Sequence, residues 1–307
     1  MINQGVILIA GLAALYFGAE SLVKGGSRLA LSMGMKPILI GLTVVAFGTS
    51  LPEFSVAVIS SASRANAISL GNVIGSNICN ILLVFGAMAL IRPVEVDSDN
   101  LRKDLPAMMA SGALLWILSA DGEITRLDGA LMILGFLIYL RMLWEARKSR
   151  FQSDIDTIRK KASIGHYALI PIGLGLLIFG GWACVRSGTS IAEHFGIAEY
   201  TVGLTIVAFG TVLPELSVGI VSSIRKSQDL TIGNSLGSFI FNSLGVIGIA
   251  ALIHPYEVAP DINSFGLPVM VASSMAFLPI ASTGQRVTRI EGAGFLIAYV
   301  VYILALF

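Results

Sequence analysis

The 307-residue sequence predicts an all-α polytopic membrane protein, with ten transmembrane helices arranged as two inverted five-helix repeats. Three observations lead to this fold class. Hydrophobic residues make up 55% of the chain and charged residues only 13%, whereas a soluble domain carries roughly 25% charged residues. The apolar residues gather in runs long enough to cross a bilayer as helices. One stretch of sequence also occurs twice, at a spacing that divides the chain into two similar halves.

Apolar runs of about 20 residues, the length needed to span the hydrocarbon core, give the ten predicted helices. In the first half they are 4–23, 37–62, 67–91, 104–120 and 127–145. In the second half they are 166–186, 198–224, 230–253, 265–282 and 290–307. The longest polar interruption lies between the halves. We therefore predict a first repeat over 1–145, a linker over 146–165, and a second, inverted repeat over 166–307.

The distribution of Lys and Arg predicts the orientation. If the N-terminus lies outside, 17 of the 20 basic residues fall in inner connections and only three in outer ones. Inner connections of membrane proteins carry such an excess. Both termini are therefore expected outside and the linker 146–165 in the cytoplasm, in a multi-pass protein of the cell membrane. Because each half has an odd number of helices, the second half enters the membrane in the opposite sense.

The duplicated stretch contains a carboxylate in each copy. Residues 41–61 read GLTVVAFGTSLPEFSVAVISS and residues 203–223 read GLTIVAFGTVLPELSVGIVSS, with identity at 15 of 21 positions. The same offset of 162 relates GNVIGSNICN, which ends at residue 80, to GNSLGSFIFN, which ends at residue 242. Glu53 and Glu215 lie in these apolar runs beside a Gly/Pro break. A duplicated intramembrane carboxylate beside a helix break indicates the ion site of a transporter.

The residues around each carboxylate offer oxygen ligands. Ser50 and Glu53 lie about one helical turn apart and so share a face. Pro52 has no N–H to donate to the carbonyl four residues earlier, so the helix is expected to open and free carbonyls near Ala46. The candidate ligands of both copies are Ala46, Thr49, Ser50, Glu53, Ser76, Asn80, Ala208, Thr211, Glu215, Ser238 and Asn242.

This set contains carboxylates, hydroxyls, amide oxygens and carbonyls, and neither His nor Cys. Hard cations such as Ca²⁺ and Na⁺ prefer these ligands, whereas Zn²⁺ or Cu⁺ would favour imidazole or thiolate. Two ionised carboxylates balance one Ca²⁺ or two monovalent cations. One site could therefore hold both kinds of ion in turn, which is the minimum requirement for exchange.

These motifs also carry a family resemblance. GTSLPE at 48–53 with GNVIGSN at 71–77, and GTVLPE at 210–215 with GNSLGSF at 233–239, resemble the alpha repeats of the cation/calcium antiporter superfamily. The nearest likeness is the prokaryotic sodium/calcium exchanger branch, and it covers essentially the whole chain. The resemblance implies exchange of Ca²⁺ for Na⁺ at the candidate ligands named above. It also implies that the first span of each half slides across a core built from the other eight helices.

Sodium is favoured as the driving ion because the proton/calcium branch tends to carry a glutamate after its GN motif. Glycine and then serine follow here in both copies. Three positions depart from the family pattern. Val212 stands where the family usually has Ser, Phe239 replaces the Asn seen at Asn77, and Asn242 stands where several relatives place Asp. The departures leave the number of Na⁺ sites open, and an H⁺-coupled Ca²⁺ antiporter stays as the alternative.

The two carboxylates also have other interpretations. Glu53 and Glu215 could be protonated structural groups, yet an intramembrane carboxylate is first of all a functional hypothesis. An intramembrane enzyme could use them as acid and base, but no nucleophile–base set accompanies them in the sequence. A cation channel would use similar groups, although inverted repeats favour alternating access. Ca²⁺, Na⁺ and the lipid bilayer are the expected partners, with no enzyme activity, cofactor, nucleic acid or obligate protein partner indicated.

The substitution Val212→Ser tests whether a Na⁺ ligand has been lost. Restoring the hydroxyl should strengthen the Na⁺ dependence of Ca²⁺ transport, because it returns an oxygen ligand to the site. The Na⁺ concentration series of Ca²⁺ uptake measures this. An unchanged apparent Na⁺ affinity and cooperativity would contradict the idea.

Overall fold

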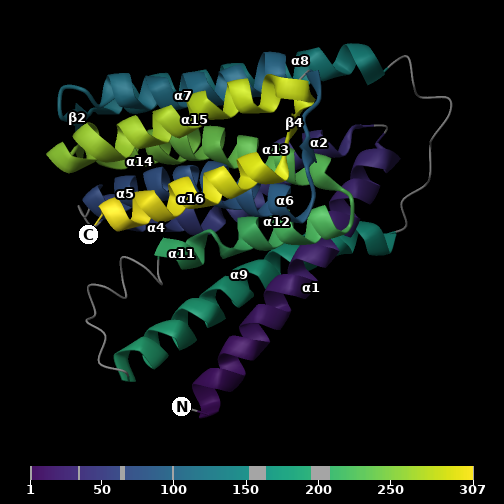
Figure 1. The fold of residues 1–307 in the computed structure, drawn as a ribbon. Coiled ribbons are helices and arrows are strands. Elements are labelled where there is room, and N and C mark those ends of the chain that lie inside the picture. The colour runs from purple at the N-terminus through teal and green to yellow at the C-terminus, as the bar shows by residue number, and fades with distance from the viewer. Residues whose placement is uncertain are drawn as a thin grey trace.

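The computed structural model describes residues 2–33, 35–62, 66–98, 100–151, 164–194 and 208–306. Figure 1 shows a stack of helices whose axes are roughly aligned. Helices α1 and α9 cross this stack obliquely on one side. Two short strand pairs lie at opposite ends of the stack. The described residues are almost entirely helical, which confirms the predicted all-α fold.

The elements of the first half are α1 (Ile2–Ser32), α2 (Pro37–Ile40), the π-helical η1 (Gly41–Val45), α3 (Ala46–Thr49), α4 (Leu51–Ala62), α5 (Asn66–Cys79), the π-helical η2 (Asn80–Val84), α6 (Phe85–Ile91), β1 (Val94–Glu95), the π-helical η3 (Asn100–Asp104), α7 (Leu105–Leu118), β2 (Glu123–Ile124) and α8 (Arg126–Phe151). Those of the second half are α9 (Ile164–His194), α11 (Ala208–Thr211), α12 (Leu213–Ile224), α13 (Gln228–Ile240), the π-helical η5 (Phe241–Val246), α14 (Ile247–Ile253), β3 (Tyr256–Glu257), the π-helical η6 (Ile262–Gly266), α15 (Leu267–Ser282), the 3₁₀ turn η7 (Thr283–Gln285), β4 (Arg286–Val287) and α16 (Arg289–Ala305).

Several helices are long and apolar enough to cross a membrane. Among the described residues they are Asn3–Ser32, Ser69–Ile91, Arg126–Glu145, Tyr167–Gly188, Gln228–Ile253 and Ile262–Gln285. If the bent pair Pro37–Thr49 and Leu51–Ala62 forms one span, the described residues contain up to seven candidate spans. The predicted span 198–224 lies partly outside the described residues. The multi-pass membrane fold is thus confirmed, and the count of ten spans stays a prediction.

Helical structure enters the predicted linker from both sides. α8 continues to Phe151 and α9 begins at Ile164, and the residues between them lie outside the described part of the chain. Arg141 donates to Glu145 at 2.8 Å near the end of α8. Such i,i+4 ion pairs support a solvated helix that no longer needs an apolar environment. The apolar run therefore ends before the helix does.

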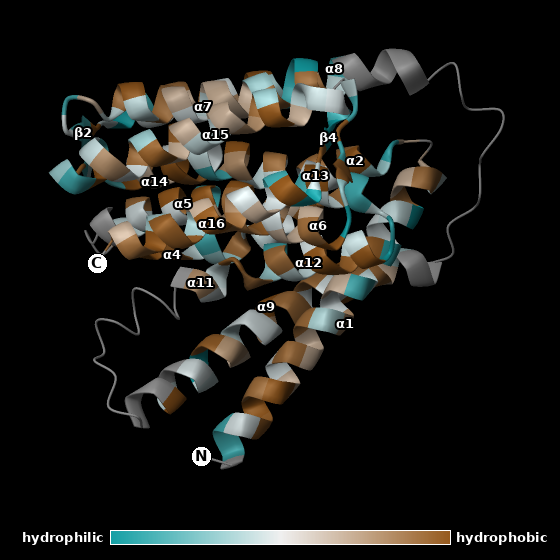
Figure 2. Ribbon diagram, in the orientation of Figure 1, coloured by the Kyte–Doolittle hydropathy of each residue, from teal (hydrophilic) through white to brown (hydrophobic). Residues whose placement is uncertain are grey.

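Hydrophobic residues predominate along the helices, and many hydrophilic residues lie toward their ends, as Figure 2 shows. Large apolar side chains that are more than half exposed include Leu134, Ile138, Ile297, Val301 and Leu304. In water such a surface would be costly, whereas lipid tails solvate it. This distribution fits a chain whose flanks contact the bilayer.

The backbones of helices α1 and α9 contact each other where the helices cross, because both helices have glycines there. A Cβ atom on Gly18 would lie 2.9 Å from the carbonyl oxygen of Gly173, and one on Gly180 would lie 2.8 Å from that of Gly11. Gly11 and Gly173 are counterparts in the repeat, as are Gly18 and Gly180, each pair 162 residues apart. Small residues allow this close approach in membranes, where dispersion contacts drive helix association.

The strand pairs join the two halves reciprocally. β1 pairs with β4 through Val94 and Val287, and β2 pairs with β3 through Ile124 and Tyr256. The strands β1 and β3 are repeat counterparts, as are β2 and β4. Reciprocal pairing of counterparts is what a two-fold relation between the halves produces.

Two arginines repeat this relation. The guanidinium of Arg289 donates to the carbonyl of Ile91 at 3.2 Å, and that of Arg126 donates to the carbonyl of Ile253 at 3.5 Å. Each arginine begins a helix of one half and lies at the C-terminal end of a helix of the other. A cation there satisfies a terminal carbonyl and complements the helix dipole.

The substitution Gly173→Ala should destabilise the α1–α9 crossing. The added methyl group would lie 2.8 Å from the carbonyl oxygen of Gly18 and the amide nitrogen of Leu22, and overpacking of this kind costs about 1–3 kcal/mol. The thermal unfolding midpoint in detergent should therefore fall.

Gly175→Ala on the same helix is the matched control. A Cβ at Gly175 meets no described atom within 4 Å, and Gly→Ala in a helix interior stabilises by roughly 0.5–1 kcal/mol. Equal midpoints for the two variants would contradict the importance of the crossing.

Candidate ion-binding site

Both predicted helix breaks are present. The first falls at Ser50, between α3 and α4, where the backbone adopts φ −84° and ψ 8° and the two helical segments meet at 46°. The second falls at Val212, between α11 and α12, with φ −89° and ψ −7°. A proline lies in the first turn after each break, where its missing N–H costs no helical hydrogen bond. The Gly/Pro signal therefore located the breaks correctly.

The two carboxylates lie in the first turns of α4 and α12, immediately after the breaks. Glu53 and Glu215 are each only 1% exposed. The positive end of each short helix faces its own carboxylate, and this dipole favours negative charge there. The Ser238 hydroxyl donates to the carbonyl of Ala46 at 3.4 Å, so the fold brings together the two copies of the motif, which are far apart in the sequence.

Neighbouring hydroxyls connect the two breaks crosswise. The Ser76 hydroxyl donates to Oε1 of Glu53 at 3.1 Å. The hydroxyl of Thr211 lies beside the carboxyl group of Glu53, and that of Thr49 lies beside Glu215. Each threonine of one half thus contacts the carboxylate of the other half. The two copies of the motif form a single polar cluster.

Two asparagines that sequence reasoning missed hold the threonines. Thr49 donates to Oδ1 of Asn234 at 3.0 Å, and Thr211 donates to Oδ1 of Asn72 at 3.4 Å. Asn72 and Asn234 are counterparts in the repeat, so the two bonds are reciprocal. The signal was available in the duplicated GN dipeptide, which could have been recognised as a polar pair facing the opposite half.

The carbonyl of Ala46 is less open than expected from the proline argument. It accepts the backbone N–H of Ser50 at 3.1 Å and lies 3.4 Å from the hydroxyl of Ser238. A carbonyl oxygen has two lone pairs, and these donors occupy both, so an ion at this position would have to displace the Ser238 hydroxyl. Its counterpart Ala208 begins α11.

Several buried polar atoms at the site have no hydrogen-bond partner among the described residues. They are the hydroxyl of Ser50, Oε2 of Glu53, both amide atoms of Asn80, Oε2 of Glu215 and Oδ1 of Asn242. Buried polar groups are nearly always paired, and each unpaired group costs about 1–3 kcal/mol. The amide nitrogens of Asn72 and Asn234 and the hydroxyl of Ser235 are also buried without such a partner, and these residues lie outside the predicted ligand set. The five residues named first all belong to that set. A cation bound among them would accept the oxygen lone pairs.

The two amides occupy π-helical turns. Asn80 begins η2 and Asn242 lies in η5. Widened turns of this kind occur frequently at functional sites, because they redirect side chains and backbone groups. The sequence offered no signal for them.

The amide of Asn242 is oriented by a hydrogen bond that has no counterpart at Asn80 in the other half. Asn77 accepts from Nδ2 of Asn242 at 3.3 Å and donates to Ser243 at 2.9 Å. Phe239, the counterpart of Asn77, instead places its ring against Gly112. Oδ1 of Asn242 is therefore held away from Asn77 and left available, whereas the Asn80 amide has no such restraint.

The donor set suits a hard cation. No group of three or more His, Cys, Asp or Glu residues able to hold a metal occurs in the described part of the chain. What the fold gathers is two carboxylates, hydroxyls and amide oxygens, which are ligands for Ca²⁺ or Na⁺. A buried, oxygen-rich site between two broken helices defines a membrane transport protein.

The comparisons with known proteins agree. The family model described as sodium/calcium exchanger protein matches residues 4–145 and 165–307, and the chain belongs to this family of transporters. The sodium/calcium exchanger MaX1 of Methanosarcina acetivorans is 30% identical, covering 98% of each chain. The putative antiporter CaxA of Alkalimonas amylolytica is 32% identical over 100% of this chain and 99% of that protein. A solved structure of the sodium-calcium exchanger NCX_Mj superposes with a TM-score of 0.88 at 31% identity, over 100% of this chain and 99% of that one.

The network around Asn77 should contribute to stability. Asn77→Leu removes the partners of Asn242 and Ser243 inside a buried site, so the free energy of unfolding should fall by about 1–3 kcal/mol. A double-mutant cycle with Ser243→Ala tests the contact itself. The two changes remove one shared hydrogen bond. The free energy of unfolding of the double variant should therefore fall by at least 0.5 kcal/mol less than the sum of the decreases in the two single variants. Strict additivity would show that the residues act independently.

Proposed function

We propose that this protein is a secondary active antiporter that exchanges Ca²⁺ for Na⁺ across the membrane by alternating access at a single central site. The inward Na⁺ gradient would drive Ca²⁺ out of the cell. The observation that carries the proposal is the convergence of Glu53 and Glu215 from two broken helices, each with an unpartnered, buried carboxylate oxygen.

Charge balance supports exchange at one shared site. Two carboxylates neutralise either one Ca²⁺ or two Na⁺, and an uncompensated buried charge is costly. Occupation by one kind of ion therefore opposes occupation by the other. Ca²⁺ tolerates irregular oxygen geometry, whereas Mg²⁺ demands an octahedral shell and gives up its waters reluctantly. A site of mixed hydroxyl, amide and carboxylate oxygens suits Ca²⁺ better.

The proposed ligands are those that the sequence predicted: Ala46, Thr49, Ser50, Glu53, Ser76, Asn80, Ala208, Thr211, Glu215, Ser238 and Asn242. We propose that Asn72, Asn77 and Asn234 act behind them as positioning residues, because they hydrogen-bond to Thr211, Asn242 and Thr49. The relatives give independent support. MaX1 is named a sodium/calcium exchanger, and the NCX_Mj structure was determined after soaking with Na⁺ and Ca²⁺.

Coupling to H⁺ is the alternative, and Val212 is the observation that favours it. Val212 is 1% exposed at the second break, where a methyl group stands in place of a hydroxyl. With one oxygen fewer, a Na⁺ site on this side is weaker, and a buried carboxylate can carry a proton instead. The serines that follow Gly75 and Gly237 favour Na⁺.

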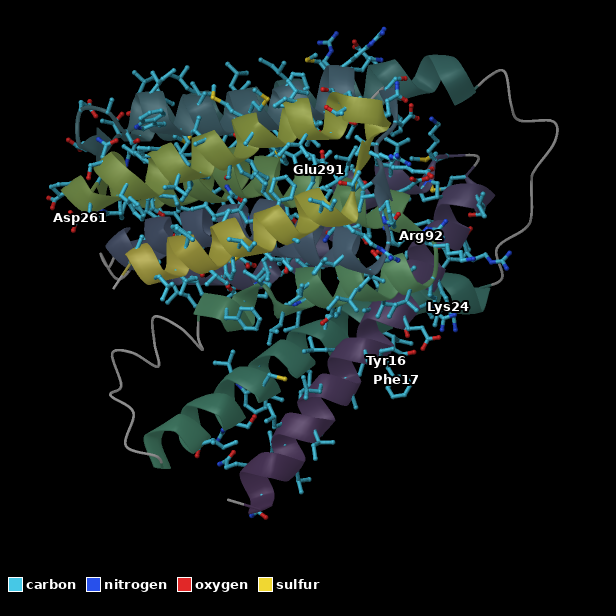
Figure 3. All side chains as sticks on the ribbon, in the orientation of Figure 1. Tyr16, Phe17, Lys24, Arg92, Asp261 and Glu291 are labelled. Carbon is cyan, nitrogen blue, oxygen red and sulfur yellow. The ribbon has the colours of Figure 1, made fainter. Side chains whose placement is uncertain are left out.

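We further propose that residues 1–145 and 166–307 are inverted repeats, with both termini outside and the connection 146–165 in the cytoplasm. The reciprocal glycine, strand and arginine contacts support the two-fold relation. Figure 3 shows Lys24 and Arg92 toward one end of the molecule and Asp261 at the other. The more basic end is expected to face the cytoplasm.

Uptake of radioactive Ca²⁺ into sealed proteoliposomes tests the function. Vesicles loaded with Na⁺, with K⁺, or with an imposed pH gradient are compared in otherwise identical buffers. An outward Na⁺ gradient should drive Ca²⁺ accumulation above equilibrium, which a channel cannot do. Accumulation driven by the pH gradient alone would replace the proposal with H⁺-coupled antiport.

Glu53→Gln and Glu215→Gln should each abolish exchange, since one remaining carboxylate cannot neutralise Ca²⁺. The loss should exceed a hundred-fold in initial uptake rate, because one close charge contact with a desolvated ion is worth roughly 3 kcal/mol or more. Glu145→Gln is the matched control, because this exposed carboxylate pairs with Arg141 away from the site. Robust exchange in either site variant would exclude the proposed site.

A further inference from the structure

A cavity lies away from the carboxylates, between α1, α9 and α12. It encloses about 860 Å³ and is lined by Tyr16, Val23, Lys24, Ser27, Arg28, Leu31, Leu169, Val221, Ile224, Arg225 and Ser227. It contains none of the candidate ion ligands, so ion exchange does not account for it.

The cavity is electropositive. Its described lining includes Lys24, Arg28 and Arg225 and no acidic side chain. Glu20, just outside the lining, accepts from Lys24 at 2.7 Å and also pairs with Arg225, so one acid offsets two bases. No described residue pairs with Arg28, which is exposed. The described residues therefore present a net positive charge of two to the cavity.

A further hydrogen-bond donor is available there. The hydroxyl of Ser27 is buried and has no partner among the described residues. Ser27 also lines the cavity, one position before Arg28 on α1. Because this oxygen is buried, an anion with several acceptor oxygens would bond chiefly to the exposed basic groups.

The remaining wall is apolar and continues onto the flank of the protein. Figure 3 shows Tyr16, Phe17 and Lys24 along α1. Tyr16 is 49% exposed, Phe17 is 56% exposed, and Ile224 on α12 is 61% exposed. In a membrane these side chains face lipid tails. The cavity therefore offers charge at one end and a continuous apolar surface beside it.

A groove on the opposite side of the molecule lacks this combination of features (Figure 1). The groove between α7 and α8 encloses about 700 Å³ and contains Arg102 and Lys103, but it also contains Asp104 and Glu145. Its charges cancel. The cavity at α1 is unlike it in combining unbalanced positive charge with an apolar flank.

We propose that the cavity between α1, α9 and α12 binds an anionic phospholipid. Arg28, Lys24 and Arg225 hold the phosphate, and the acyl chains lie along Tyr16 and Ile224. A free phosphate would leave the apolar wall without a partner, and a zwitterionic lipid would leave the net charge uncompensated. Basic pockets between transmembrane helices bind acidic head groups in this manner.

Native mass spectrometry of the purified full-length chain tests the proposal. The delipidated protein is incubated with phosphatidylglycerol or with phosphatidylcholine, and the fraction carrying one lipid is measured. Phosphatidylglycerol should be retained preferentially, and Arg28→Gln should weaken its binding about five-fold, the effect of one basic side chain at a membrane surface. Lys24→Gln gives the same test if Arg28→Gln does not fold.

Lys226→Gln is the matched control, because it removes one positive charge beside Arg225 at a residue that does not line the cavity. Its lipid binding should equal that of the unmodified protein. Equal losses in Arg28→Gln and Lys226→Gln, or equal binding of both lipids, would overturn the proposal. Displacement of the lipid by millimolar inorganic phosphate would assign the cavity to a free anion instead. The readout is lipid binding, so it is independent of whether the chain exchanges Ca²⁺.

Discussion

The breaks at Ser50 and Val212 impose the constraint on which the rest of the fold depends. Within the hydrocarbon core, a backbone group without a partner costs several kcal/mol, so an interrupted helix cannot face lipid. The same breaks expose the first turns of two short helices, where Glu53 and Glu215 lie. Both carboxylates are almost completely buried. The surrounding helices are therefore required to enclose the polar cluster.

Contacts that are repeated between counterpart residues of the two halves form part of that enclosure. A contact made by a residue of one half is made again by its counterpart in the other, as in the threonine–asparagine bonds and the glycine crossing of α1 and α9. One duplicated motif thereby provides both walls of the site. The helices come close enough for this because small residues occupy the contact positions.

The two halves differ where a functional asymmetry would be most consequential. Asn77 fixes the amide of Asn242, whereas Phe239 provides no equivalent restraint for Asn80. Val212 likewise replaces a hydroxyl at the second break. A third difference is that Ser76 donates to Glu53, whereas its counterpart Ser238 donates to the carbonyl of Ala46. All three lie within the candidate site, so the asymmetry concerns how each half would hold an ion.

The sequence by itself determined the membrane class, the repeat, the breaks and the two carboxylates. Each depends on composition or on residues close together in the chain: apolar run length, a Gly/Pro signal, and a charge within an apolar segment. The extension of α8 past residue 145 escaped this reasoning, because apolar run length predicts where a helix can leave the membrane and does not predict where it ends. Only the tertiary structure decided that Thr49 pairs with Asn234 and that Asn77 orients Asn242. Those partners lie 185 and 165 residues apart, and no local pattern specifies which side chains meet when two halves pack together. The cavity at α1 has the same origin, because its charges come from helices that become neighbours only in the folded chain.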